Sequence, residues 1–187
     1  HKQSINSLIY KIINESQKII NSYDCKVIIQ GDAASSFAVA LSAFNEGKEV
    51  IHVEAGLRTH NLRSPFPEEG FRKMISHISN IHFCPTIKSV ENLKNEGITE
   101  NVHLVGNTIV DSCAQIIDKG ESSDYLNELI SSNDDYYLCT LHRRENINNF
   151  QSMWEQLNQI SENKTIIYIK HPSCLLYTSP SPRDKTV

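Results

Sequence analysis

The fold can be inferred from the segment His52-Val-Glu-Ala-Gly-Leu-Arg-Thr59 and from Ser64-Pro-Phe-Pro-Glu-Glu69, which follows it closely. Residues 48–53 form a short apolar run, which predicts a strand buried in a parallel sheet. A glycine breaks this strand, and two prolines delay the next helix. Acidic residues that follow such a strand lie at its carboxyl end, where open α/β sheets bind ligands. The sequence therefore predicts an active site that is built from carboxylates at this sheet edge.

Strands and helices alternate along the chain on both sides of this stretch. Strands are predicted at residues 26–29, 48–53, 81–84, 102–105, 136–141 and 165–169. Helices are predicted at about residues 2–22, 36–45, 69–79, 86–95, 108–119 and 150–160. This alternation predicts the α/β class with a doubly wound parallel sheet.

The strongest linker signal lies at residues 119–135, a polar stretch that one short apolar patch at 125–130 interrupts. We therefore expect a first α/β domain at residues 1–120 and the start of a second at 121–173. Residues 174–187 match nothing before them and are expected to be a non-native tail. The chain is expected to be a fragment, truncated at both ends.

Composition excludes several classes of function. Of the 187 residues, 39% are apolar and 21% charged, as in an ordinary globular protein. A net charge of -4 without a Lys/Arg cluster argues against nucleic-acid binding. No apolar run reaches the roughly 20 residues of a membrane helix. The five cysteines never adopt C-x-x-C spacing, which favours reduced thiols and a cytoplasmic location.

Four carboxylates are candidates for acid/base chemistry. Asp32 follows the predicted strand 26–29, and Glu54 follows the strand 48–53. Glu68 and Glu69 open the next helix, where the helix dipole favours negative charge. The alternative for Asp32 is a helix cap, and for Glu68 and Glu69 a charge at a helix start.

Basic residues near these strand ends suggest an anion site. Arg58 and Arg72 either bind phosphate or pair with the glutamates. His142 follows the strand 136–141 together with Arg143 and Arg144, which favours an anion site there.

Two apparent motifs are incomplete. The H-x-E pattern of His52 and Glu54 lacks the P-C-x-x-C partner of zinc deaminases, so no metal is predicted. Residues 106–108 lack the G-x-G-x-x-G spacing of a dinucleotide loop, so no nicotinamide cofactor is predicted.

The motifs together resemble the non-hydrolysing UDP-N-acetylglucosamine 2-epimerases, over about residues 25–171. They are Gly31-Asp32, His52 to Thr59, Ser64 to Glu69 with Arg72, Gly106-Asn-Thr108 with Asp111, and His142-Arg-Arg-Glu145. The resemblance implies two Rossmann-like domains facing each other as in GT-B glycosyltransferases, the first lacking its opening strand here. It also implies interconversion of UDP-N-acetylglucosamine and UDP-N-acetylmannosamine in a cytoplasmic homodimer.

The family's functional residues can be assigned to the positions of this sequence that match its motifs. The resemblance implies catalytic roles for Asp32, Glu54, Glu68 and His142. Arg143 stands where the family contacts a second UDP-N-acetylglucosamine, an allosteric activator. Substrate-binding roles are expected for Arg58, Glu69, Arg72, Asn107, Arg143 and Arg144.

The chain also departs from the family pattern. Gly31-Asp-Ala-Ala34 replaces Gly-Asp-Thr, and Gly70-Phe71 replaces a small residue followed by Asn. Because the opening strand and the diphosphate-binding segment are missing, the chain alone is expected to have little or no turnover. Alternatives are a hydrolysing epimerase, a GT-B-type glycosyltransferase, or a non-catalytic nucleotide-sugar-binding protein.

Overall fold

The computed structural model describes residues 4–120, 122–132, 135–140 and 150–169. The chain divides into two compact units, residues 1–119 and 120–187, which are described separately below. Among the described residues, none of the helices has the length and apolar content that a membrane crossing requires.

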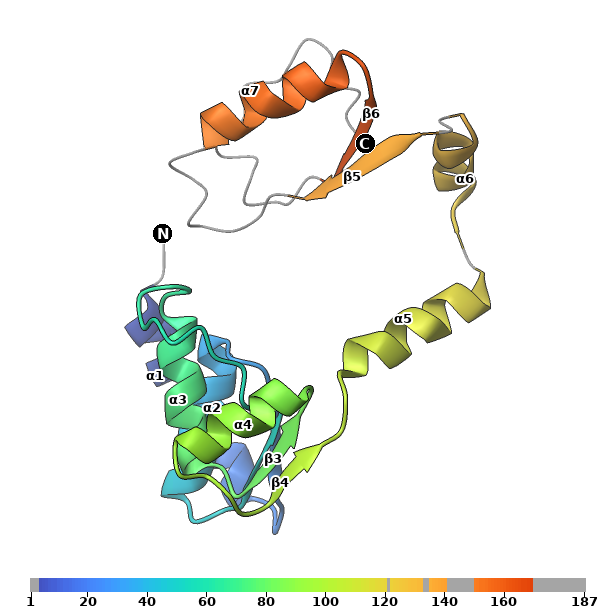
Figure 1. Ribbon diagram of the computed structural model, residues 1–187. Helices are drawn as coiled ribbons and strands as arrows, with labels where there is room; N and C mark the ends of the chain where they lie inside the picture. Colours follow the sequence, from blue (N-terminus) through green and yellow to red (C-terminus); the bar gives the residue numbers. More distant parts are fainter. Residues whose placement is uncertain (1–3, 121, 133–134, 141–149, 170–187) are drawn as a thin grey trace. The chain divides into compact units, whose positions relative to one another are not determined.

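The first unit is an α/β structure with a parallel sheet (Figure 1). Its elements are α1 (Ile5–Asn21), β1 (Val27–Gln30), α2 (Ala34–Asn45), β2 (Val50–Val53), α3 (Glu68–Ile78), β3 (Ile81–Cys84), α4 (Ile87–Asn95), β4 (Val102–Leu104) and α5 (Thr108–Lys119). The four strands pair in the order β1-β2-β3-β4, and all three pairings are parallel. The predicted α/β class is confirmed, and the predicted strands agree with the observed ones to within two residues.

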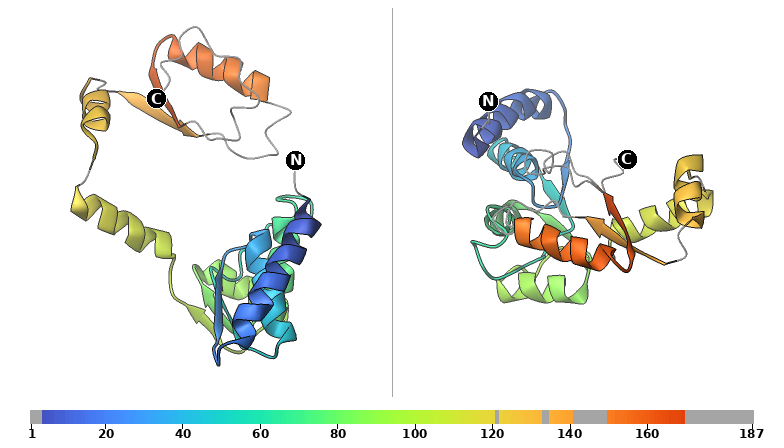
Figure 2. Two further views of the ribbon diagram at one scale, coloured as in Figure 1. Left: turned by 180° about the vertical axis from the view of Figure 1, so that it is seen from behind. Right: turned by 90° about the horizontal axis from the view of Figure 1, so that it is seen from above.

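Three crossover helices, α2, α3 and α4, cover the same face of this sheet (Figures 1 and 2). Parallel strands that pair in sequence order and are joined by right-handed crossovers place their helices on one side. Burial accordingly alternates along β2, where Val50 and His52 are buried and Ile51 and Val53 are half-buried. On the opposite face Ile28 is 67% exposed. The central strand is therefore covered more fully on one face than on the other.

The core beneath the helices depends on small side chains in α2. Ala38, Ala40 and Ala43 are fully buried, so α1 and α3 approach this helix closely. Phe37 stacks on Phe71 of α3 with ring centroids 4.9 Å apart. This packing fixes α3, and with it the carboxylates at its first turn.

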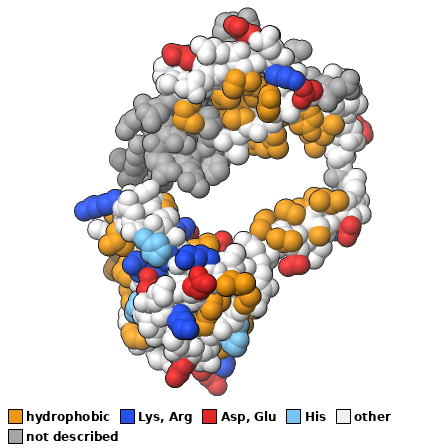
Figure 3. All heavy atoms as spheres, viewed as in Figure 1, with side chains coloured by type: hydrophobic (Ala, Val, Ile, Leu, Met, Phe, Trp, Pro, Cys, Tyr) orange, Lys and Arg blue, Asp and Glu red, His pale blue; other side chains and the backbone are white. Residues whose placement is uncertain are grey.

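Helix α5 leaves the sheet after β4 and exposes much of its apolar face. Ile109, Val110, Ile116 and Ile117 are each more than half exposed, and hydrophobic side chains follow the helix in Figure 3.

The second unit contains α6 (Asp124–Ser131), β5 (Tyr136–Thr140), α7 (Phe150–Ser161) and β6 (Thr165–Ile169). β5 and β6 pair in parallel, and Trp154 of α7 packs edge-on against Tyr168 of β6. The apolar patch at 125–130, which the sequence analysis included in a linker, is helical. Ser123 caps this helix by accepting the Leu126 N–H, and its apolar residues recur at helical spacing.

Candidate active site

Two acidic side chains come together where β1 and β2 end. Asp32 follows β1 and Glu54 follows β2, and the Gly31 N–H donates to the Val53 carbonyl at 3.1 Å. A methyl group placed on Gly31 would lie 3.7 Å from Glu54 Oε2. The Glu54 carboxylate therefore lies against the turn that carries Asp32. The structure brings these two predicted site residues to one edge of the sheet.

Glu54 has a backbone conformation that residues with side chains usually avoid. Its φ of 69° lies in the left-handed region, where the Cβ atom crowds the following carbonyl at a cost of about 1–2 kcal/mol. Strained residues of this kind are concentrated at active sites and switch regions. The conformation of Glu54 therefore supports a functional role for its side chain.

Gly56 makes the sharp turn after β2 possible. Its φ is 83°, and a methyl group at this position would lie 2.3 Å from the carbonyl oxygen of Ser89 in α4. Asn92 of the same helix donates from Nδ2 to the Gly56 carbonyl at 3.0 Å. Glycine is required here both by the backbone conformation and by the close approach of α4.

Arg58 anchors the loop after β2 to α3 and to the end of α4. Its side chain is fully buried, and Nε and Nη2 donate to the two carboxylate oxygens of Glu96 at 2.9 and 2.7 Å. Nη2 also donates to Ser76 Oγ, and Nη1 donates to the Leu57 carbonyl. The hydrogen bonds from Arg58 lower the pKa of Glu96. Of the two expectations for Arg58, the structure shows the pairing with a glutamate.

Glu69 is buried and holds the same loop from the first turn of α3. Its carboxylate accepts the N–H groups of Thr59 and His60 and Nη1–H of Arg72, each at 3.1 Å. Burial alone would raise the pKa of Glu69, but these hydrogen bonds lower it below its ordinary value. The residue is 0% exposed. The structure thus shows Glu69 positioning the loop, and the substrate-binding role expected for this residue stays a prediction.

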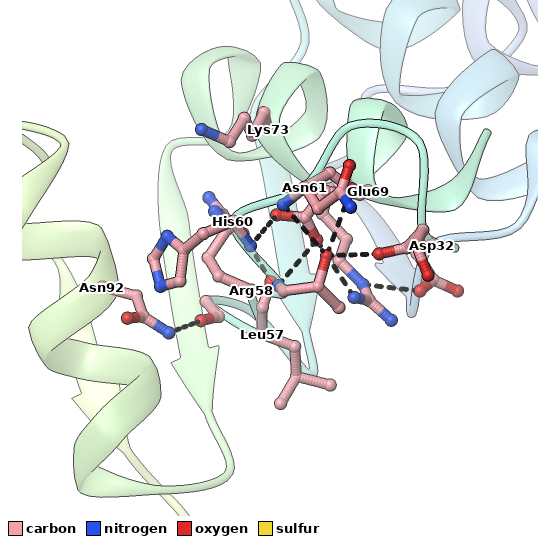
Figure 4. A network of polar contacts seen from close by, with 12 residues as sticks. Asp32, Leu57, Arg58, His60, Asn61, Glu69, Lys73 and Asn92 are labelled. Atoms are coloured by element: carbon pink, nitrogen blue, oxygen red, sulfur yellow. Dashed lines mark hydrogen bonds and ion pairs between the residues drawn. The ribbon is translucent and has the colours of Figure 1, made fainter. Parts of the chain in front are cut away.

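Arg72 connects Glu69 to Asp32 (Figure 4). Its Nε donates to Asp32 Oδ2 at 2.7 Å, while Nη1 donates to Glu69 Oε2. The Asp32 side chain is 30% exposed, whereas that of Glu69 is enclosed. One guanidinium thus bridges a buried carboxylate and an accessible one, and it orients Asp32 at the sheet edge. The alternative in which arginine pairs with carboxylates is seen for Arg72 as well.

Replacing Glu69 with Gln is expected to lower the free energy of unfolding by about 2–4 kcal/mol. The amide would present a donor to groups that are themselves donors, and Arg72 would lose a buried partner. Urea unfolding of the chain measures the effect. Glu68→Gln is the matched control and should cost about 0.5 kcal/mol, since this side chain is only half-buried. Equal losses in the two variants would contradict the positioning role of Glu69.

The other predicted site residues are placed as follows. Glu68 is the first residue of α3 and is half-buried. Asn107 Oδ1 accepts the Ile109 N–H at 3.1 Å, so its side chain supports the start of α5. Three predicted site residues lie outside the described part of the chain: His142, Arg143 and Arg144.

Two histidines are buried at neighbouring positions of the sheet beneath the site. His52 of β2 is in register with His82 of β3, and the two are 1% and 2% exposed. Their Nε2 atoms lie 3.0 Å from the Gly31 carbonyl oxygen and 2.9 Å from that of Ser76. Burial lowers the pKa of both, that of His52 to about 4. From the sequence, His52 was considered only as part of an H-x-E pattern, at which no metal was predicted. Its place inside an apolar strand was the signal of burial.

Lowering the pH from about 7 to about 4 is expected to destabilise the first unit through His52. Its folded pKa of about 4 lies below the ordinary 6.5, so the unfolded chain binds more protons in that range. Stability is therefore fully present above about pH 6.5, and about 3 kcal/mol of it is lost as the pH falls to about 4.

Urea unfolding across this pH range measures the loss. In His52→Gln, the loss of unfolding free energy between about pH 7 and about pH 4 should be smaller by about 3 kcal/mol. In the control His77→Gln, which replaces an exposed histidine of α3, the loss should be the same as in the wild type. The same pH dependence in the wild type and in His52→Gln would be inconsistent with a titrating buried ring.

Comparison with known proteins identifies a matching family and relatives of this chain. The sequence profile of the UDP-N-acetylglucosamine 2-epimerase family matches residues 1–175. UDP-N-acetylglucosamine 2-epimerase of Campylobacter jejuni is 35% identical over an alignment of 183 residues, which covers 91% of this chain and 48% of the relative.

Solved structures agree with this similarity. The Neisseria meningitidis UDP-GlcNAc 2-epimerase bound to UDP-GlcNAc superposes with a TM-score of 0.83 at 30% identity, covering 94% of this chain and 50% of the other. The Methanocaldococcus jannaschii enzyme in complex with UDP-GlcNAc and UDP gives 0.80 at 33% identity, with the same two coverages. The chain thus spans about half the length of the proteins it matches.

Proposed function

The chain belongs to the UDP-N-acetylglucosamine 2-epimerase family. We therefore propose that the protein interconverts UDP-N-acetylglucosamine and UDP-N-acetylmannosamine by inverting C2 of the sugar. The observation that carries the proposal is the pair of carboxylates, Asp32 and Glu54, on adjacent strand ends. Relatives solved with UDP-GlcNAc and with UDP support the same substrate class for this chain.

The chemistry explains why several carboxylates are needed. The C2 proton of the sugar is not next to a carbonyl and is barely acidic, so its direct removal is unfavourable. When the bond from C1 to the UDP oxygen breaks first, the bonding electrons leave with UDP and C1 gains oxocarbenium character. A carboxylate then removes the C2 proton, which gives 2-acetamidoglucal and UDP. Protonation of C2 on the other face and return of UDP to C1 complete the inversion.

Each ring face needs its own acid or base, and Asp32, Glu54 and Glu68 are the proposed groups. Positioned general acids and bases typically contribute about 10²–10⁴-fold each. Arg72 keeps Asp32 oriented, and Glu69 with Arg58 fixes the loop that follows Glu54. In this scheme the buried network positions the site, and the accessible carboxylates exchange protons with the sugar.

Further roles rest on the resemblance of the His142-Arg-Arg-Glu145 motif to the family. We propose His142 as an active-site residue beside the substrate, Arg143 as a contact of a second, activating UDP-N-acetylglucosamine, and Arg144 as a substrate contact. A cytoplasmic homodimer is proposed on the same basis. Sedimentation of the intact protein with and without UDP-N-acetylglucosamine tests the dimer.

Product analysis of the intact protein with UDP-N-acetylglucosamine tests the proposed reaction. The expected result is a stable mixture of the two UDP-sugars without free sugar. Release of N-acetylmannosamine and UDP would indicate a hydrolysing epimerase. Ligand binding without any new product would favour a binding protein, or a transferase that requires an acceptor.

A further inference from the structure

Residues of β2 hold both backbone polar groups of Gly31, the residue before Asp32. The Gly31 N–H donates to the Val53 carbonyl at 3.1 Å. The Gly31 carbonyl oxygen lies 3.0 Å from His52 Nε2. Gly31 is in the left-handed conformation with a φ of 72°, so the chain turns sharply between the strand and Asp32. The position of Asp32 therefore depends on how firmly this turn is anchored.

The surroundings of His52 determine its tautomer. A carbonyl oxygen only accepts hydrogen bonds, so the proton must be on Nε2. Nδ1 is buried and has no hydrogen-bond partner among the described residues. The ring is 1% exposed, so it contacts neither solvent nor a substrate bound at the sheet edge. Its one polar contact in the described structure is the backbone of the Asp32 turn.

We propose that His52 is a positioning residue of the epimerase reaction: its Nε2–H fixes the Gly31 carbonyl and thereby sets where the Asp32 carboxylate stands. The inference rests on the proposed function. Arg72 orients the Asp32 side chain from one side, and His52 holds the backbone beneath it. A displacement of about 1 Å at a catalytic group can cost up to about 10²-fold in rate, so the anchor matters for turnover more than for substrate binding.

His82 provides a matched control inside the same sheet. It is in register with His52, is equally buried, and likewise has an Nδ1 without a partner among the described residues. Its Nε2, however, lies 2.9 Å from the carbonyl oxygen of Ser76 in α3. Loss of either ring removes a buried hydrogen bond of the same kind, but only loss of His52 releases the turn before Asp32.

The test compares His52→Leu, His52→Gln and His82→Leu in the intact protein. For His52→Leu we expect kcat to fall by about tenfold or more while KM changes by less than about threefold. His52→Gln, whose amide nitrogen substitutes for Nε2, should recover most of the lost kcat. His82→Leu should lose stability but keep kcat. Equal kcat losses in His52→Leu and His82→Leu, or an unchanged kcat in His52→Leu, would overturn the proposal.

Amide hydrogen exchange without substrate separates this inference from the proposed function. Exchange at residues 31–33 should accelerate in His52→Leu and not in His82→Leu, whatever reaction the protein catalyses. Unchanged exchange would overturn the positioning role. If His52→Leu does not fold, nitrogen NMR of the wild-type ring decides: a protonated Nε2 and a bare Nδ1 support the proposal, and the opposite tautomer refutes it.

Discussion

Replacing Glu54 with Gln is expected to lower kcat for epimerisation by about 10²–10⁴-fold. The amide keeps the shape of the side chain but neither accepts the C2 proton nor returns one. KM for UDP-N-acetylglucosamine should change by less than about threefold, because the loss falls on a step after binding. Steady-state kinetics of the intact protein measures both constants. Unchanged turnover in this variant would remove Glu54 from the mechanism.

A second substitution at the same position separates catalysis from folding. Glu54→Gly should raise the free energy of unfolding by about 1 kcal/mol, since glycine adopts the left-handed conformation without strain. The same variant should be as inactive as Glu54→Gln. A gain in stability together with a loss of activity is expected where strain is kept for function. Destabilisation by Glu54→Gly would show that the side chain has a structural role.

Replacing Gly56 with Ala is expected to cause the largest loss of stability, about 3–5 kcal/mol. The new methyl group would lie 2.3 Å from the Ser89 carbonyl oxygen, and the backbone φ of 83° would strain any side chain. Because the clash is with helix backbone, rotamer changes do not relieve it. Either α4 or the loop after β2 must move, and the loop carries Glu54 and Arg58. Urea unfolding measures the loss.

Gly47 offers the control for this prediction. Its φ is 67°, but a methyl group there would meet nothing within 4 Å. Gly47→Ala should therefore cost only the conformational part, about 1–2 kcal/mol. If the two variants lose the same stability, the close approach of α4 to Gly56 contributes nothing.

The strands were predictable because each is a short, largely apolar run, and all but β5 are followed within three residues by a glycine or a proline. The location of the candidate site was predictable from the same pattern, since the carboxyl ends of parallel strands lie at one edge of the sheet. Asp32 and Glu54 come together there for that reason. Helix α6 was missed because its few apolar residues stand between polar segments. The polar composition of the region led to the prediction of a linker, although these apolar residues have helical spacing.

The roles of individual charged residues were not predictable from the sequence. Arg58 pairs with Glu96, which lies 38 positions further along the chain. No local sequence pattern predicts this ion pair. Glu68 and Glu69 are adjacent and chemically identical, yet only Glu69 points into the fold. That difference arises from the helical phase of α3, which the packing of Phe71 determines. The Gly31 contact of His52 likewise requires the register of β1 and β2.

Proton NMR of the reaction in deuterated water tests most directly whether carboxylates at this sheet edge exchange the C2 proton. The elimination mechanism predicts that UDP-N-acetylmannosamine formed by the intact protein carries deuterium at C2, and that Glu54→Gln slows this incorporation together with turnover. Product that retains its original C2 proton would contradict removal of this proton by a carboxylate in exchange with solvent.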